Sequence, residues 1–155
     1  MKKIDFGQTL QLLGNVGVVV GILLLAYELN QNRDLMRAQT RNDLAQNVIG
    51  LFVSDMDDGE LADVIRRGLA GEELSGTESW RYERRMNAWF RHWENMHYQY
   101  RAGLYDETEA SKNLEAIAVA LERDPGWREY WCRRGSLYSS EFAAEFDSLL
   151  GARQC

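Results

Sequence analysis

The chain has 155 residues, a formal net charge of −6 at pH 7 and 27% charged residues. This length allows one soluble domain with one core beside a membrane segment, and a second domain is not expected. The acidic balance argues against a nucleic-acid-binding protein, because contacts with phosphate groups require clustered Lys and Arg side chains. We therefore expect no nucleic acid among the partners of this protein.

The first predicted element is an uncharged stretch over residues 6–27. As a helix this stretch is about 33 Å long, close to the thickness of the hydrocarbon core of a bilayer. A secretory signal peptide begins in a similar way, but this stretch is long and no small-x-small cleavage site lies near Leu25-Ala26-Tyr27. The pattern predicts a retained membrane anchor over residues 1–30, in contact with membrane lipid, followed by an all-α soluble domain over residues 31–155.

Three glycines in the predicted span indicate a face for helix association. Gly17-x-x-x-Gly21, with Gly14 one turn earlier, matches the small-residue pattern that lets the backbones of membrane helices approach closely. Both seam positions of a seven-residue repeat pass through these glycines and reach Ile49 and Phe52, but the repeat turns polar at residues 28, 31 and 42, so a long coiled coil is not expected. Glycine is also common in membrane helices without association, so a homo-oligomer and a chance pattern both fit the sequence.

A second face of the span carries three polar side chains, Gln8, Gln11 and Asn15, at spacings of 3 and 4. Polar groups in hydrocarbon usually bond across helices or line water. These residues therefore lie at the level of the lipid headgroups or join helices together, or they line the vestibule of a small homo-oligomeric channel.

The charges that flank the span do not determine its orientation. Lys2, Lys3 and the terminal amine on one side nearly balance Arg33, Arg37 and Arg41 on the other.

The cysteines provide a second criterion for the orientation. Cys132 and Cys155 are too few for a disulfide framework in a chain of this length, so we expect free thiols, with Cys132 partly buried and inert. Free thiols are typical of a reducing compartment. This expectation favours a cytoplasmic C-terminal domain.

Helix start and stop signals divide the rest of the chain. Neither Pro nor Gly interrupts residues 22–49, so the first helix is expected to continue to Asp55. Later helices are predicted over residues 60–69 and 77–102, and after Asp106, Pro125 and Ser139, with no convincing strand. The expected N-terminal caps are Asp57 or Asp58, Ser75 with Glu78, Asp106 with Glu109, Asp124, and Ser139.

The helix over residues 77–102 carries a stripe of large apolar side chains at intervals of 4, 3, 4, 3 and 4: Tyr82, Met86, Trp89, Trp93, Met96 and Tyr100. Such a stripe is more often core than a cofactor box, because each large ring buries much apolar area. The aromatic side chains expected in the core or on a docking surface are Trp89, Trp93, Tyr100, Trp127 and Trp131.

The same helix carries several charged residues. We expect a solvated, salt-bridged face, with a surface for anionic lipid or a partner as the alternative. The residues concerned are Arg81, Arg84, Arg85, Arg91 and Arg101, with Glu78, Glu83 and Glu94.

Motifs for catalysis or cofactor binding do not rise above background. Glu94-x-x-His97 is half of a di-metal motif, but the other histidine, His92, lies about 140° round the helix and cannot share an ion with His97. Cys132 has no histidine near it in sequence. We expect no catalytic, cofactor-binding or metal-binding residues, and a protein that is not an enzyme.

Several segments resemble an uncharacterised family of small bacterial proteins with one N-terminal transmembrane helix and a helical C-terminal domain. In that family the membrane helix ends in a pattern like L-x-Y-L-A-x-Q-I-R-Q-N-T, to which residues 24–32 are similar, apart from Glu28 and Asn30. Residues 94–106 are similar to the family's E-N-x-Y-x-Q-Y-x-x-G-L-x-D, and residues 125–131 and 139–142 continue the likeness. The resemblance implies a membrane-anchored helical protein and supplies no activity.

These observations predict an all-α protein in which one N-terminal transmembrane helix continues into a small cytoplasmic helical bundle at a bacterial inner membrane. Its predicted function is that of a self-associating accessory subunit that docks a partner, and another membrane protein is one such partner. The alternative is a small homo-oligomeric channel or membrane sensor.

Overall fold

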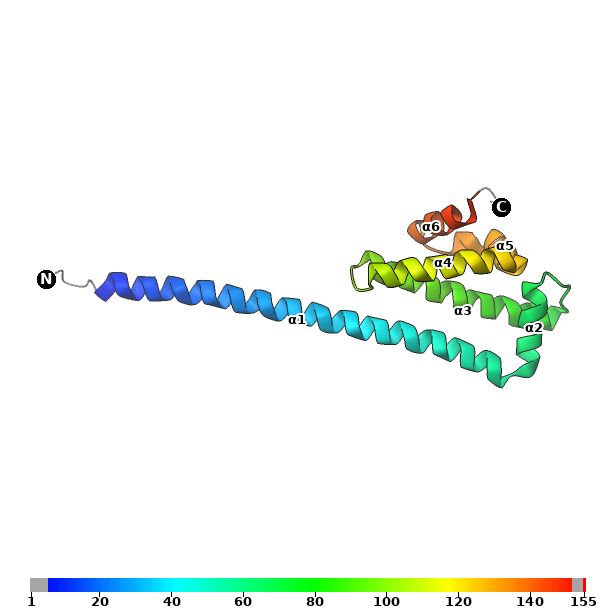
Figure 1. Cartoon of the computed structure of the whole chain (residues 1–155), viewed down its shortest axis with the longest axis horizontal. Helices are drawn as coiled ribbons and strands as arrows, with labels where there is room; N and C mark the ends of the chain where they lie inside the picture. The colour runs from blue at the N-terminus through cyan, green and yellow to red at the C-terminus, as the bar shows by residue number, and fades with distance from the viewer. Residues whose placement is uncertain (1–5, 152–154) are drawn as a thin grey trace. The chain divides into compact units, whose positions relative to one another are not determined.

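The computed structural model describes residues 6–151 and 155, and the regular secondary structure of this part of the chain is entirely helical, which confirms the expected all-α class. Figure 1 shows the order of the elements. They are α1 (Phe6–Asp57), α2 (Gly59–Leu69), α3 (Gly76–Arg101), α4 (Glu107–Arg123), α5 (Pro125–Arg134), the short 3₁₀ helix η1 (Gly135–Leu137) and α6 (Ser140–Leu150).

The chain forms two compact units, Met1–Gln39 and Thr40–Cys155. In the first unit, α1 is a continuous helix whose residues 10–39 are all exposed. By length and composition, α1 is the one helix among the described residues that could cross a membrane. The second unit, which we call the domain, contains the last turns of α1 and all later helices.

Three predicted N-terminal caps are confirmed. The side chain of Asp58 accepts a hydrogen bond from the backbone N–H of Leu61 at 3.0 Å at the start of α2. Ser75 and Glu78 form the reciprocal capping box of α3, and Asp106 accepts from two backbone N–H groups of α4. Local sequence therefore determines where these three helices begin, because each cap satisfies backbone donors that the helix leaves free.

Three other predicted capping side chains act differently. Glu109 pairs with Arg41 at 2.8 Å instead of completing a capping box with Asp106. Asp124 occupies the cap position of α5, but its carboxylate binds Arg123 at 2.7 Å and makes no cap bond. Ser139 caps α6 without a side-chain bond. In each case the helix begins where predicted, but the predicted side-chain bond is absent. For Glu109 and Asp124, the carboxylate binds an arginine instead.

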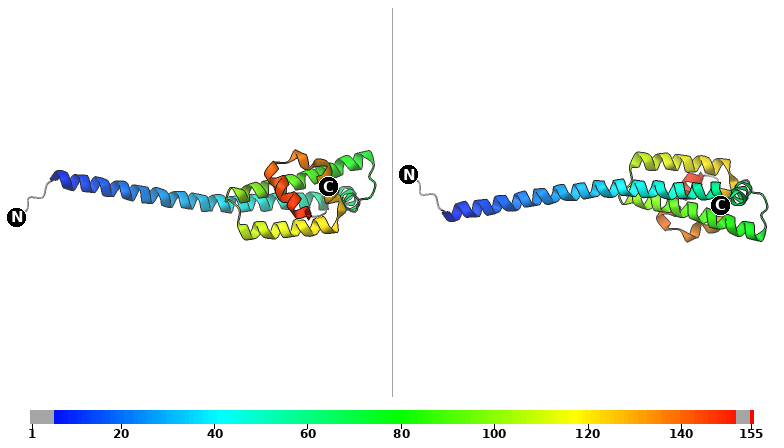
Figure 2. Two further views of the ribbon diagram at one scale, coloured as in Figure 1. Left: turned by 90° about the horizontal axis from the view of Figure 1, so that it is seen from above. Right: turned by 90° about the horizontal axis from the view of Figure 1, so that it is seen from below.

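Phe90 lies at the centre of the core, although the predicted stripe did not include it. The side chain is fully buried, and its ring centroid lies 5.0 to 5.7 Å from rings on α3, α5 and α6 and in the segment between the last two. Figure 2 shows why: α6 crosses over α3 and α4, so α3 is covered on more than the one face that a simple stripe describes. The rings around Phe90 are Trp93, Tyr130, Trp131, Tyr138 and Phe146.

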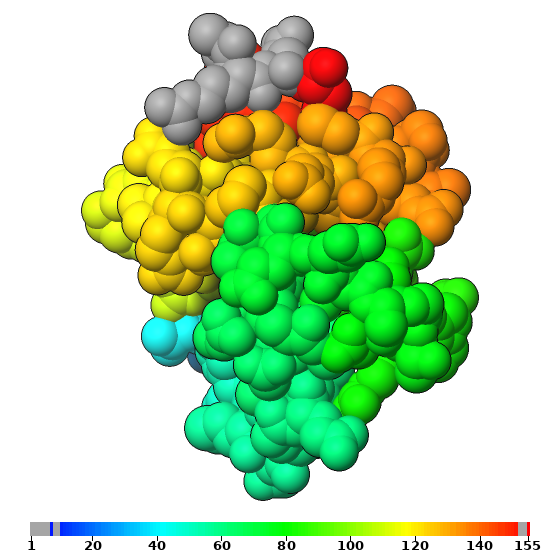
Figure 3. Space-filling view, turned by 90° about the vertical axis from the view of Figure 1, so that its right-hand side faces the viewer, coloured from blue at the N-terminus to red at the C-terminus, as the bar shows by residue number. Residues whose placement is uncertain are grey.

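Two glycines allow α2, α3 and α5 to approach closely. A Cβ atom on Gly68 of α2 would lie 2.5 Å from the ring of Tyr82, and one on Gly126 of α5 would clash with the backbone oxygen of Gly68. Figure 3 shows this end of the domain, where α2 and α5 meet in one continuous surface. Only residues without a side chain fit this crossing.

Candidate functional site

The predicted association face of α1 is open in the structure. A Cβ atom added at Gly14, Gly17 or Gly21 would meet nothing within 4 Å outside the helix itself. Gln11 and Asn15 are likewise exposed, while the side chain of Gln8 lies outside the described residues. The glycine face therefore has room for the close approach of a second helix.

Arg85 joins α3 to the last turns of α1, so the prediction of a solvated face is wrong for this residue. Its guanidinium pairs with Asp55 at 2.5 Å and donates to the hydroxyl of Ser54 at 3.0 Å and to the carbonyl oxygen of Leu51. Burial raises the pKa of Asp55 above its ordinary value, although the charge and hydrogen bond of Arg85 oppose this effect. Only 8% of Arg85 is exposed, so these contacts fix the last turns of α1 to the rest of the domain.

Three of the other four arginines of α3 confirm the expected ion-paired face, and Arg84 lies over an aromatic ring instead. Each lies at least partly exposed beside an acidic or aromatic side chain, a placement that contributes little to stability at the surface. The pairs are Arg81 with Asp58, Arg91 with Glu94, Arg101 with Glu141, and Arg84 over the ring of Trp80.

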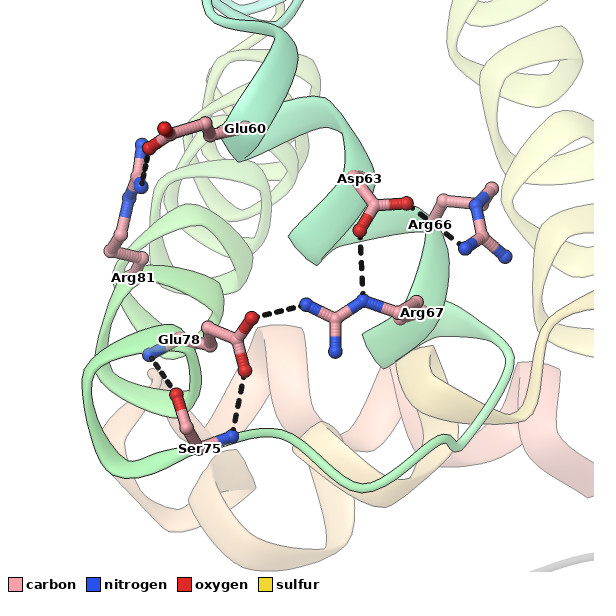
Figure 4. A network of polar contacts seen from close by, with 7 residues as sticks. All are labelled: Glu60, Asp63, Arg66, Arg67, Ser75, Glu78 and Arg81. Carbon is pink, nitrogen blue, oxygen red and sulfur yellow. Dashed lines mark hydrogen bonds and ion pairs between the residues drawn. The ribbon is translucent and has the colours of Figure 1, made fainter.

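A network of charged side chains closes the junction between α2 and α3 (Figure 4). Asp63 binds Arg66 and Arg67 on its own helix at 3.0 and 2.9 Å, and Arg67 continues to Glu78 at the start of α3. Hydrogen bonding lowers the pKa of Glu78 to about 2, first through the backbone N–H of Ser75 and then through Arg67. The carboxylates and guanidinium groups of this network bind one another, which indicates a structural role.

Glu94, the acidic half of the possible metal motif, attaches α6 to α3. Its carboxylate accepts from the backbone N–H of Ser139 at 2.7 Å and from Arg91 at 2.6 Å. Burial raises the pKa of Glu94, but the bonds from Ser139 and Arg91 outweigh this effect, so the pKa lies below its ordinary value. His97 packs against the ring of Phe142, with centroids 5.8 Å apart. Within the residues that the structure describes, no three His, Cys, Asp or Glu side chains gather as metal ligands would.

The expectation of free cysteines is wrong. Cys132 on α5 and Cys155 beyond α6 form a disulfide, with Cα atoms 5.4 Å apart, and both residues are exposed. Cys132 is therefore neither a partly buried residue nor a free thiol. The count of two cysteines gave no sign of this pair, because the approach of residues 23 positions apart depends on how α6 folds back. The argument for a cytoplasmic domain from free thiols no longer holds.

The five aromatic side chains expected in the core or on a docking surface separate into two groups. Trp93, Trp127 and Trp131 are buried in the core and cannot dock a partner. Trp89 and Tyr100 are only partly covered. Trp89 is half-buried against Phe52, with ring centroids 5.2 Å apart, and Tyr100 is 38% exposed. The sequence pattern could not separate these groups, because the stripe does not show which helices cover it.

A patch of exposed apolar side chains lies on the last turns of α1. Ile49, Phe52, Val53 and Met56, which we call the 49–56 patch, are between 42% and 74% exposed. Their spacing of 3, 1 and 3 places them on one side of the helix. Ile49 and Phe52 belong to the same seven-residue repeat as the three glycines, so residues of this repeat are exposed in both units.

An open groove of about 420 Å³ lies within the domain, between the last turns of α1 and helices α3 and α4. Leu44 and Met96 form part of its apolar lining, and Arg41 and Lys112 are its cationic residues. Both cations already have partners, Glu109 at 2.8 Å and Glu115 at 2.7 Å. The groove has the volume of a small-molecule site, but its charges are compensated by the protein itself.

Comparison of the chain with known protein families, with characterised proteins and with solved structures finds no match. The resemblance to the family of small bacterial membrane proteins stays a prediction, and the function has to be inferred from the surfaces of the molecule.

Proposed function

We propose that this chain is a single-pass protein of a bacterial inner membrane that self-associates through Gly14, Gly17 and Gly21. In this proposal the domain is an accessory module that docks a partner, which can be another membrane protein. The protein acts by binding and not by catalysis. The polar contacts of the domain support this assignment, since the side chains of Arg85, Glu78 and Glu94 hold helices together.

The observation that carries the proposal is the uncovered apolar surface of α1. Eleven large aliphatic side chains between Leu10 and Leu25 are each about half exposed or more. Burial of one such side chain is worth about 1.5 to 3 kcal/mol, so leaving all of them in water is costly by tens of kcal/mol. Lipid covers such a surface on every side, whereas a folded soluble domain covers only one.

Self-association is supported by two surfaces of α1, the glycine face and the 49–56 patch. Hydrocarbon gives no hydrophobic reason for two membrane helices to meet, so close backbone packing at small residues is the usual source of attraction. The 49–56 patch continues the same repeat in water, where burying Ile49 and Phe52 against a second copy is favourable. The glycine face of α1 is thus suited to association in lipid, and the 49–56 patch is suited to association in water.

The test is the mass of the full chain in mild detergent, with a matched pair of variants. The double substitution Gly17→Leu and Gly21→Leu fills the glycine face, and we expect it to shift the wild-type oligomer to single chains. Val19→Leu adds bulk to the opposite face, is 56% exposed in the wild type, and should leave the oligomer unchanged. An oligomer that survives the double substitution removes the glycine face from the proposal.

A small homo-oligomeric channel or membrane sensor is the alternative. The observation that favours it is that Gln11 and Asn15 place exposed polar groups on an otherwise apolar helix. Ion flux through liposomes that contain the purified protein tests this function. Flux that falls in Asn15→Leu but not in Val20→Leu, on the other side of the helix, supports a channel, and absence of flux from the wild type rejects it.

A further inference from the structure

We infer that the domain lies on the oxidising side of the membrane, outside the cytoplasm, and that the residues before the span lie in the cytoplasm. This inference rests on the proposed membrane anchor and goes beyond it, because it specifies the compartment in which a partner meets the domain. It reverses the orientation that free cysteines favoured.

The evidence is the exposed disulfide between Cys132 and Cys155. These are the two cysteines of the whole sequence, and they are bonded to each other. The glutathione and thioredoxin systems keep cytosolic thiols reduced, so a solvent-accessible disulfide persists mainly in exported parts of proteins. The periplasm of a bacterium keeps such pairs oxidised.

The position of the disulfide indicates a structural bond and not a redox-active one. Cys132 is on α5 and Cys155 comes after α6, 23 positions later, whereas catalytic pairs typically occupy a short Cys-x-x-Cys segment. The bond closes the segment of residues 132–155, which contains α6, and Phe142 and Phe146 of this helix are buried in the aromatic core. Its effect is therefore to keep the last helix on the domain.

The flanking charges do not determine the orientation. Lys2 and Lys3 precede the span, and Arg33, Arg37 and Arg41 come shortly after it. With the terminal amine the two sides are nearly balanced, and the one extra basic side chain after the span, which by itself would favour the opposite orientation, is too small a difference to fix a single span. The disulfide is the independent evidence that selects between the two arrangements.

The experiment combines membrane fractionation with thiol labelling of the full chain in bacterial cells. Denatured wild-type protein from the membrane fraction is treated with a polyethylene-glycol maleimide before and after reduction. We expect no additions before reduction and two afterwards. In a host that lacks its periplasmic thiol oxidase, additions should appear without reduction.

The matched control is Cys155→Ser, which leaves Cys132 as a single exposed thiol. In intact spheroplasts a membrane-impermeant maleimide should label this thiol as fully as it does after permeabilisation, and external protease should digest the domain. These readouts need no folded domain, so they hold even where the variant is unstable.

Two results would overturn the inference, and they are distinguishable. Labelling that requires permeabilisation, with the chain in the membrane fraction, places the domain in the cytoplasm and leaves the anchor intact. Recovery of the chain in the soluble fraction without detergent rejects the membrane anchor and, with it, any orientation.

Discussion

Residues 10–39 of α1 and the whole of α3 are both unbroken helices, yet they present their apolar side chains in opposite ways. In α1 the apolar residues from Leu10 to Leu25 occupy every side and are exposed, whereas in α3 most of them lie on faces that α2, α5 and α6 cover, with charged residues between them. A helix that is apolar all round is covered by lipid or by protein on every side, and one with a limited apolar face is covered by a protein neighbour on that face. In the proposed function the same type of backbone therefore serves two environments within one chain.

The difference implies that equal truncations have unequal effects in the two regions. The side chains of α3 contribute to the stability of the domain, and in the proposed function those of the span contribute to its residence in lipid. Substitutions placed in each region test this separation.

Phe90→Ala should have the largest effect on the domain. Removing a fully buried ring that packs among six others leaves a cavity, and the expected loss is about 3 to 5 kcal/mol in the free energy of unfolding. Chemical denaturation of the full chain in detergent, monitored by tryptophan fluorescence, measures this loss. Leu23→Ala, at a residue that is 65% exposed in the span, should leave the same transition unchanged. Equal losses would show that the two regions do not differ in this way.

Reduction of the disulfide should have the next largest effect. The bond closes a loop over 23 positions, and the loss of that constraint on the unfolded chain is worth about 3 kcal/mol. Denaturation of the wild type with and without reductant measures the difference. Cys155→Ser should match the reduced wild type and no longer respond to reductant. A transition that reductant leaves in place would contradict the role of the bond in holding α6.

Arg85→Met tests the attachment of the last turns of α1 to α3. The substitution keeps most of the side-chain volume but leaves Asp55 partly buried without its cation, for an expected loss of about 2 kcal/mol. Arg84→Met, at the exposed neighbouring position, should cost less than about 0.5 kcal/mol. The second substitution Asp55→Asn should restore part of the stability that Arg85→Met removes. Without such recovery, the loss comes from packing and not from the stranded charge.

Much of the fold could be predicted from local sequence, because caps act between neighbours in the chain. Asp58, Ser75 and Asp106 each bond to backbone groups within three residues, so the sequence alone shows where those helices start. The uncharged stretch at residues 6–27 likewise predicts α1 without knowledge of any partner.

The features that sequence did not reveal depend on tertiary contacts. Phe90 is central because α5 and α6 cover a second side of α3, and no spacing within α3 contains that information. Glu94 binds the start of α6 across 45 positions, and Cys132 meets Cys155 across 23. Arg85 resembles its solvated neighbours in sequence and differs from them only because Asp55 lies against it. Among the predicted surfaces, the glycine face could be located, but its partner could not.

Glu78→Gln should have the smallest effect, and the size of this effect depends on pH. Hydrogen bonds lower the pKa of Glu78 from an ordinary 4.5 to about 2, so its contribution to stability is fully present above pH 4.5 and is lost as pH falls towards 2. The variant should therefore be less stable than the wild type at pH 7 and equal to it near pH 2. Because the carboxylate lies at the surface, salt should weaken the difference.

Denaturation midpoints between pH 7 and pH 2 at low salt test this expectation. Glu73→Gln, at an exposed position in the preceding loop, is the matched control and should behave like the wild type. Because the two chains differ only at residue 78, a pH-dependent difference between Glu78→Gln and the wild type reports on the carboxylate of Glu78. A difference that persists at pH 2 would mean that Glu78 acts through packing, whereas one that disappears there assigns its role to the ionised carboxylate that joins Ser75 and Arg67.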